Sequence, residues 1–204
     1  MFRRALSRKM KILLLVAAVA ILACIAGPRV WNRIRQGSPW DPVQGAIGLG
    51  PLTSPRIALE KSARRLTVYD GDKAVKIYRV ALGPSRGDKA REGDKRTPEG
   101  EFYVCLKNPR SRFTLSLGLS YPNIEDARRG LHDGLINQAQ HDQIVGAIER
   151  GGTPPRKTAL GGESMIHGCG NRWDWTLGCI ALNDDDVREL YRAIPVGTPV
   201  TILP

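Results

Sequence analysis

Residues able to carry out chemistry are concentrated in one segment, ESMIHGCGNRWDWTLGCIALN, at residues 163–183. It contains two of the four cysteines and one of the three histidines. A nucleophilic cysteine needs a partner that favours the thiolate, and backbone N–H groups that converge on the oxyanion formed during the reaction. Gly178 stands directly before Cys179, where it permits a tight turn that presents such groups. A strand ending at His167 and a loop returning to Cys179 would bring the two side chains together, which predicts a cysteine nucleophile with a histidine base.

Two other interpretations of these residues stay open at this point. A lone cysteine and a lone histidine are more often a small core residue and a hydrogen-bonded imidazole than a catalytic pair. A zinc hydrolase could use His132, His141 and His167, with Cys169 as a further ligand. The nine-residue spacing of His132 and His141 does not place them on one helix face, and the sequence has no His-Glu-x-x-His motif. We therefore expect no metal.

Short runs rich in β-branched and aromatic residues dominate the chain after residue 55 and predict strands. The turn Asp70-Gly71-Asp72 joins two of these runs in a hairpin. A polar loop rich in Gly, Lys and Asp occupies residues 83–100. The predicted strands lie at residues 57–60, 65–69, 74–82, 101–106, 112–119, 163–166 and 199–203.

Residues 124–150 carry a different pattern, with apolar side chains at mostly three-to-four spacing among polar ones. This spacing predicts one or two amphipathic helices inserted into the β domain. Another helix start, Asn183 followed by three aspartates, comes directly after the cysteine segment, and residues 187–194 supply its apolar face. The sequence therefore predicts a mainly β domain of the α+β class, with a helical insert and a C-terminal helix after Cys179.

Two motifs stand out in this arrangement. The first is His167-Gly168, a variable loop, and then Thr176-Leu177-Gly178-Cys179-Ile180. The second is Thr97-Pro98-Glu99-Gly100-Glu101-Phe102, of the form T-P-x-G-x-[FY]. Together they resemble the L,D-transpeptidase catalytic domain family (YkuD-like), cysteine enzymes that act on peptidoglycan. The resemblance covers residues 56–204 and implies a β-sandwich with an inserted helical segment.

By this resemblance Cys179 is the nucleophile and His167 the general base and acid, with the imidazole oriented by a backbone carbonyl. The N–H groups of Gly178 and Cys179 would form the oxyanion hole. The thiolate would attack the carbonyl of the third residue of a peptidoglycan stem peptide, expel D-alanine, and pass the acyl group from a thioester to an amine acceptor. Water as the acceptor would make the enzyme an L,D-carboxypeptidase or endopeptidase. A non-enzymatic wall-binding module is a further alternative, and no cofactor is expected.

The resemblance also implies substrate contacts, which we assign to residues near the motifs: Thr176, Gly168, Arg172, Tyr121 and Arg112. Two positions depart from the family pattern, Leu177, where many members have His, and Ala181, where many have Arg or Asn. A basic residue would then have to bind the substrate carboxylate in place of the polar side chain missing at Ala181. The candidates for this role are Arg112, Arg172, Lys107 and Arg110.

The other cysteines carry different expectations. Cys169 adjoins the proposed base, so we expect a packing or redox role for it. A Cys105–Cys169 disulfide belongs to one of the three full pairings that four cysteines allow, and the sequence does not choose among them. An imidazole beside the thiol predicts a lowered pKa for Cys179, because the imidazolium stabilises the thiolate.

The N-terminus has the pattern of an export signal. Residues 1–11 are basic, and residues 12–26, ILLLVAAVAILACIA, are apolar and uncharged. Basic residues before such a run keep the N-terminus in the cytoplasm. We therefore expect an inner-membrane signal anchor or signal sequence at 1–27, a Pro- and Gly-rich linker at 28–55, and a catalytic domain at 56–204 in the cell envelope. Cleavage of the signal and lipidation of Cys24 stay open.

Composition and charge bound the function further. With 42% hydrophobic and 25% charged residues, the chain is neither disordered throughout nor a polytopic membrane protein. Its net charge of +11 fits either an ordinary basic surface or attraction to an anionic polymer. Because no zinc-finger, RNA-recognition or basic-zipper pattern accompanies this charge, nucleic acid is not an expected partner.

Overall fold

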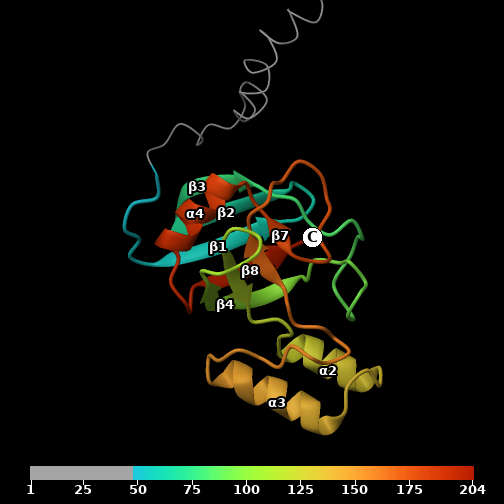
Figure 1. The fold of residues 1–204 in the computed structure, drawn as a ribbon. Helices are drawn as coiled ribbons and strands as arrows, with labels where there is room; N and C mark the ends of the chain where they lie inside the picture. Colours follow the sequence, from blue (N-terminus) through green and yellow to red (C-terminus); the bar gives the residue numbers. More distant parts are fainter. Residues whose placement is uncertain (1–47) are drawn as a thin grey trace, which may run out of the picture. The chain divides into compact units, whose positions relative to one another are not determined.

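The computed structural model describes residues 48–204, which form a mixed sheet with three helices around it (Figure 1). The expected signal at 1–27 and most of the expected linker lie outside the described residues. Among residues 48–204, no helix is long and apolar enough to cross a membrane. The elements are β1 Pro55–Glu60, β2 Arg65–Asp70, β3 Lys73–Arg79, β4 Gly100–Asn108, β5 Ser116–Leu119, α2 Ile124–His132, α3 Gln138–Glu149, β6 Met165–His167, β7 Ile180–Ala181, α4 Asp184–Ala193 and β8 Pro199–Leu203.

The eight strands form one curled sheet in the order β3-β2-β1-β8-β4-β5-β6-β7. Strand β4 serves both halves, because its residues 100–103 pair with β8 and residues from 104 onward pair with β5. The β1–β8 and β6–β7 pairs are parallel, and the others are antiparallel. The two ends of the sheet meet where Ala81 and Ala181 exchange backbone hydrogen bonds of 2.9 and 2.8 Å. This closure places β6, β7 and the segment after β3 next to one another.

The core lies inside the curl of the sheet. Alternate residues of its strands, such as Ile57 and Leu59 of β1, are almost fully buried because successive side chains of a strand point to opposite faces. Helix α4 adds Val187 and Leu190 to the same cluster. Each fully buried aliphatic side chain of this kind contributes about 1.5–3 kcal/mol to the stability of the fold. The apolar face predicted for the last helix is thus confirmed.

Helices α2 and α3 lie side by side at one end of the domain (Figure 1). Asn123 and Asn137 begin them, each in a capping box: the Asn side chain accepts the N–H three residues on, and that residue's side chain accepts the Asn N–H. The two helices share a small core of their own, formed by Ala127, Ile136, Ile144 and Leu160. The predicted helical insert is therefore confirmed, as a pair of helices.

The predicted mainly β fold with a helical insert and a C-terminal helix is confirmed, and the differences lie at element ends. The strand predicted at 112–119 begins only at Ser116, because Thr114 has a φ of +70° that interrupts the extended backbone. The strand predicted at 163–166 lies at 165–167. Strand β7 escapes sequence analysis, because two residues show no alternation. Asn183 precedes α4 without a side-chain capping bond. The three aspartates in the first turn stabilise the helix instead, because their negative charges lie at the positive end of its dipole.

Candidate active site

His167 ends strand β6 with its imidazole held between aromatic rings. The residue is 2% exposed, Phe113 stacks on it with ring centroids 4.5 Å apart, and Trp175 meets it edge-on at 5.6 Å. Its Nδ1 lies 2.7 Å from the carbonyl oxygen of Gly168. In the neutral ring Nδ1–H donates to this carbonyl, which leaves the lone pair on Nε2. Burial lowers the pKa of His167, although the Gly168 carbonyl favours the charged form. At neutral pH the imidazole is a base with a fixed orientation.

Cys179 stands directly before β7, on the same face of the sheet as His167. In the parallel β6–β7 pair His167 lies opposite Ala181, and side chains two residues apart along a strand share a face. The thiol donates a hydrogen bond to the carbonyl oxygen of Glu163 at 3.2 Å. Between the two described side chains of His167 and Cys179, no hydrogen bond is formed. The structure thus brings the two predicted residues to one face, with the thiol turned to Glu163.

The pKa of Cys179 corrects an expectation from the sequence. The neighbouring imidazole predicted a lowered pKa, but burial of the thiol raises it, and the negative charge of Glu163 adds to the rise. The N–H of Met165 and the ammonium of Lys89 act in the opposite direction and do not outweigh burial. The resting pair is therefore a neutral thiol and a neutral imidazole, so formation of the thiolate needs a base.

The turn before Cys179 is built by Thr176 and Gly178. The Thr176 hydroxyl donates to the Cys179 carbonyl at 2.7 Å and accepts the Gly178 N–H at 3.2 Å, and the residue is 2% exposed. Gly178 has a φ of +126°, and a Cβ on it would lie 2.6 Å from the carbonyl oxygen of Arg96. Only glycine therefore fits here. These bonds commit Thr176 to the turn in place of the expected substrate contact, and the Gly178 N–H expected in the oxyanion hole is bonded to the Thr176 hydroxyl.

Gly168 is likewise needed for its size. A Cβ on it would lie 2.5 Å from Oδ1 of Asp184 and 2.9 Å from the carbonyl oxygen of Phe113. The Gly168 N–H donates to that same carbonyl at 3.0 Å. Glycine is therefore required after His167 for a structural reason. The backbone of Gly168 passes close to Phe113 and to Asp184 at the start of α4, while the Gly168 carbonyl holds the imidazole.

Two residues expected near the substrate are used by the fold instead. Tyr121 is 1% exposed and its hydroxyl donates to the Leu160 carbonyl at 3.0 Å, so it has no surface left for a substrate. The Lys107 ammonium donates to the carbonyls of Tyr191 and Ile194 at the end of α4. Cations at a helix C-terminus stabilise its unpaired carbonyls. Both expectations are corrected by these bonds.

The remaining basic candidates lie on the surface of the domain. The Arg112 guanidinium lies 4.9 Å from the centroid of Phe113, the ring that stacks on the imidazole. The Arg172 guanidinium lies 5.9 Å from the ring of Trp173, which is 65% exposed. Arg110 is exposed in the turn after β4. Arg112 is thus joined to the site through Phe113.

The second cysteine of the segment differs from Cys179 in its surroundings. Both cysteines follow a glycine, so that feature does not separate them. Cys169 is exposed with a φ of +77°, and its N–H donates to Asp184 at 2.8 Å. An exposed position corrects the packing role expected for it. Cys105 is buried, and the three cysteines among residues 48–204 are all free, so the structure holds no Cys105–Cys169 disulfide.

The other histidines lie away from this segment, on the helical insert. His132 and His141 each contact the aspartate that follows them, at 2.9 Å. Within the described range, no three His, Cys, Asp or Glu residues are grouped so that they could hold a metal ion.

Sequence analysis misses two parts of the site. Phe113 is one, since nothing in the sequence says that it stacks on His167. The loop of residues 83–96 is the other: the carbonyl of Arg96 packs against Gly178, and Lys89 forms an ion pair with Asp94 at 2.9 Å whose side chains are 7% and 9% exposed. A polar loop sequence gives no signal that separates buried charges from solvated ones.

Comparison with known proteins identifies the domain that this site belongs to. Residues 54–202 match the family model described as the L,D-transpeptidase catalytic domain, YkuD. The chain belongs to this family. The resemblance inferred from the two motifs is thereby confirmed, and the closed sheet with its His-Gly and Gly-Cys segments is the L,D-transpeptidase domain of this chain.

Individual relatives of the L,D-transpeptidase domain are distant. The putative L,D-transpeptidase YqjB of Bacillus subtilis is 28% identical over 159 residues, which cover 76% of each chain. The probable L,D-transpeptidase YcfS of Escherichia coli is 26% identical over 183 residues, or 81% of this chain and 51% of the relative. The crystal structure of the helical cell shape determining protein Pgp2 from Campylobacter jejuni is 22% identical with a TM-score of 0.48, covering 77% of this chain and 50% of that one. The chain thus spans about half the length of the last two proteins.

Proposed function

We propose that this chain is a peptidoglycan L,D-transpeptidase, with Cys179 as the nucleophile and His167 as the general base and acid. The observation that carries the proposal is the fixed imidazole. Its Nδ1 is bound by the Gly168 carbonyl, so Nε2 is free to accept a proton, and Cys179 lies on the same face of the sheet. Because a carbonyl already orients the ring, this dyad needs no acidic third member.

In the acylation step His167 removes the proton of the Cys179 thiol as sulfur attacks the carbonyl carbon of the third residue of a stem tetrapeptide. The thiol first leaves the Glu163 carbonyl that it contacts at rest. The C–N bond to the terminal D-alanine then breaks, the proton on Nε2 passes to the departing amine, and a thioester remains on the cysteine. Because thiol and imidazole are both neutral at rest, this proton transfer accompanies the attack.

In the second step an amine of the acceptor gives its proton to His167 and attacks the thioester, and the protonated imidazole returns the proton to the departing Cys179 sulfur. In both steps the negatively charged oxygen accepts a hydrogen bond from the Cys179 N–H, which the turn of Thr176 leaves unbonded. Water in place of the amine gives an L,D-carboxypeptidase or endopeptidase with the same groups. The amine acceptor is preferred because the family is one of transpeptidases.

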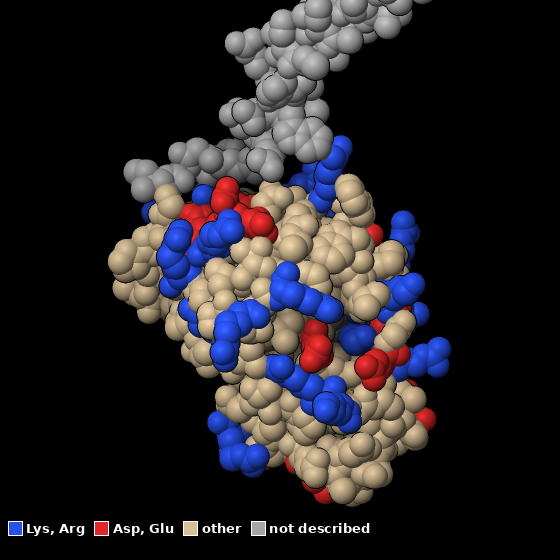
Figure 2. Space-filling view, in the orientation of Figure 1, with Lys and Arg blue, Asp and Glu red and all other residues tan. Residues whose placement is uncertain are grey.

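The proposed partners are peptidoglycan stem peptides, with no nucleic acid. Peptidoglycan lies outside the cytoplasmic membrane, so we also propose a cell-envelope location, with residues 1–27 as the inner-membrane anchor or signal. On the face shown in Figure 2, Lys and Arg side chains are spread widely and outnumber Asp and Glu. A surface of this kind favours an anionic wall polymer over a neutral peptide.

Mass analysis of peptidoglycan fragments incubated with the full chain tests the proposal. A tetrapeptide donor with an amine acceptor should give a crosslinked product and free D-alanine. The Cys179→Ala variant should give neither, and Cys169→Ala, which removes the exposed cysteine of the same segment, should keep most of the activity. A tripeptide product alone would move the assignment to a carboxypeptidase, and no product from any stem peptide would favour a wall-binding module.

A further inference from the structure

The buried ammonium of Lys89 lies against the turn that carries Cys179, and no step above uses it. The residue is 6% exposed, in the loop between β3 and β4. A Cβ placed on Gly178 would lie 3.8 Å from its Nζ. The ammonium is therefore separated from the backbone of the nucleophile's turn by little more than one van der Waals contact.

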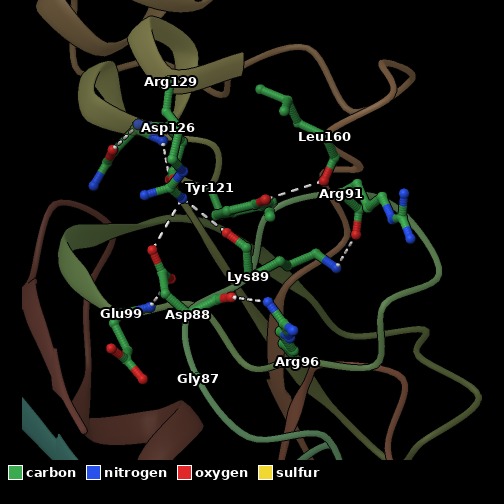
Figure 3. A network of polar contacts seen from close by, with 12 residues as sticks. Gly87, Asp88, Lys89, Arg91, Arg96, Glu99, Tyr121, Asp126, Arg129 and Leu160 are labelled. Atoms are coloured by element: carbon green, nitrogen blue, oxygen red, sulfur yellow. Dashed lines mark hydrogen bonds and ion pairs between the residues drawn. The ribbon is translucent and has the colours of Figure 1, made fainter. Parts of the chain in front are cut away.

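The loop fixes Lys89 from several sides. Its Nζ donates to Oδ1 of Asp94 at 2.9 Å and to the Arg91 carbonyl at 3.0 Å, and Figure 3 shows the side chain extended toward that carbonyl. The carbonyl of Lys89 accepts from Arg129 of α2 at 2.8 Å. The ring of Tyr121 lies beside the ammonium, with its centroid at 5.9 Å. The ammonium is thus held in the interior of the domain by two acceptors.

A second buried lysine, Lys61 in the turn between β1 and β2, reaches the same loop with its ammonium and has all three hydrogens bonded. Lys61 donates to the carbonyls of Gly87 and Thr97 and to Glu99, each at 2.7 Å. An ammonium has three hydrogens, and each of those of Lys61 is hydrogen-bonded to one of these acceptors. Lys89 has two acceptors among the described residues. Its third hydrogen has no acceptor among residues 48–204, and the turn of Gly178 adjoins the ammonium.

We propose that Lys89 is a positioning residue that supplies fixed positive charge to the Gly178–Cys179 turn, where the reaction creates negative charge on sulfur. The proposal rests on the proposed function in taking Cys179 as the nucleophile. Asp94 holds Lys89 in place and partly offsets its charge, so the two members of the ion pair act on the thiol with opposite sign. The other charged or titratable groups that face the thiol are Glu163 and His167.

This opposition of sign separates an electrostatic role from a purely structural one. Lys89→Met removes the ammonium and leaves the Asp94 carboxylate without its partner. The lost positive charge and the remaining negative charge both disfavour the thiolate. Loss of the carboxylate charge in Asp94→Asn leaves the ammonium unopposed, which favours the thiolate. If the ion pair served only to hold the loop, both variants would disturb the turn in the same way, and the pKa of Cys179 would move in the same direction in both.

The experiment measures the rate at which iodoacetamide alkylates Cys179 in the full chain across pH, with the modified peptide quantified by mass spectrometry. In Lys89→Met the midpoint should rise by about one pH unit, with alkylation at a fixed pH below it about tenfold slower. In Asp94→Asn the midpoint should fall. Lys61→Met, which removes the other buried ammonium that binds this loop, is the matched control and should leave the midpoint in place.

Midpoints that move in the same direction for Lys89→Met and Asp94→Asn, or that do not move, would overturn the proposal. If Lys89→Met does not fold, as judged by circular dichroism, Lys89→Gln takes its place, and a midpoint that is unchanged or that moves in the same direction as that of Asp94→Asn refutes the charge role. The readout needs no peptidoglycan. A wild-type protein without transpeptidase products but with opposite shifts would contradict the proposed function and leave the electrostatic role of Lys89 standing.

Discussion

Phe113 covers His167 face to face, with ring centroids 4.5 Å apart and an interplanar angle of 23°. The same residue accepts the Gly168 N–H through its carbonyl, so it holds both the imidazole and the backbone that orients it. Removal of the ring in Phe113→Ala should let water reach the imidazole. The pKa of His167, which burial lowers, should then rise toward its ordinary value, and the turnover rate should fall about tenfold or more.

Titration of His167 by NMR in the Phe113→Ala variant checks this. Trp173→Ala, which removes an exposed aromatic from the same segment without touching the imidazole, is the control. An unchanged pKa of His167 in Phe113→Ala would mean that the stacked ring does not contribute to the burial of the base.

The pH dependence of the rate should follow from the two pKa directions. Burial places the pKa of His167 below its ordinary value of 6.5 and the pKa of Cys179 above its ordinary value of 9.0. The reactive state has neutral imidazole and thiol, so kcat/KM should rise as His167 loses its proton below pH 6.5. It should then stay level until Cys179 ionises above pH 9, with both limbs belonging to the pair jointly. A narrow optimum between pH 6.5 and 9 would instead indicate a resting thiolate–imidazolium pair.

Gly178 is expected to tolerate no side chain. Its φ of +126° disfavours any other residue, and an added Cβ would lie 2.6 Å from the Arg96 carbonyl oxygen. Gly178→Ala should lower the free energy of unfolding by about 2 kcal/mol or more and remove activity, since the Cys179 N–H is displaced. Urea unfolding measures the first effect. Gly197→Ala is the control, because Gly197 also has a positive φ, +91°, and nothing lies within 4 Å of its Cβ position. Equal losses in the two variants would show that the contact with Arg96 is unimportant.

Asp94 should make the fold sensitive to acid. Burial alone would raise the pKa of its carboxyl, but hydrogen bonds from Lys89 and from three backbone N–H groups outweigh burial and lower it to about 2. Because this value is below that of the unfolded chain, the ionised carboxylate stabilises the fold above about pH 4, and the stabilisation is lost as the pH falls toward 2. Asp94→Asn should therefore lower the free energy of unfolding by about 2 kcal/mol at pH 7 and by progressively less below pH 4.

Urea unfolding between pH 7 and pH 3 measures this difference. Asp72→Asn, a change in the exposed β2–β3 turn, should show no such trend. A difference between wild type and Asp94→Asn that stays constant across the pH range would contradict the assignment.

The parts of the fold that could be predicted are those with a local pattern. Turn residues predict the Asp70-Gly71-Asp72 hairpin. Turn residues or apolar residues at three-to-four spacing predict the two helices of the insert and α4. Strand β7 and the Ala81–Ala181 closure do not, because both depend on pairing between segments far apart in sequence. The pairing of β7 with β6 is nevertheless what brings Cys179 to the same face of the sheet as His167.

The same division holds for the site. His167 and Cys179 could be chosen from the sequence because glycines flank them in a recognisable motif. Tyr121 and Lys107 could not be assigned correctly from the sequence. Only the folded structure shows that the Tyr121 hydroxyl is buried against Leu160 and that the Lys107 ammonium caps the end of α4. The direction of the Cys179 pKa shift also depends on burial, which is a property of the packed loop around it.

The role of Cys179 as the nucleophile is tested by finding which atom carries the acyl group. The full chain is incubated with a tetrapeptide donor and no acceptor amine, quenched in acid, digested, and analysed by mass spectrometry for a thioester-linked adduct. We expect a tripeptide acyl adduct on the Cys179 peptide in the wild type and in Cys169→Ala, and none in Cys179→Ala. An adduct on Cys169, or one that persists in Cys179→Ala, would contradict it.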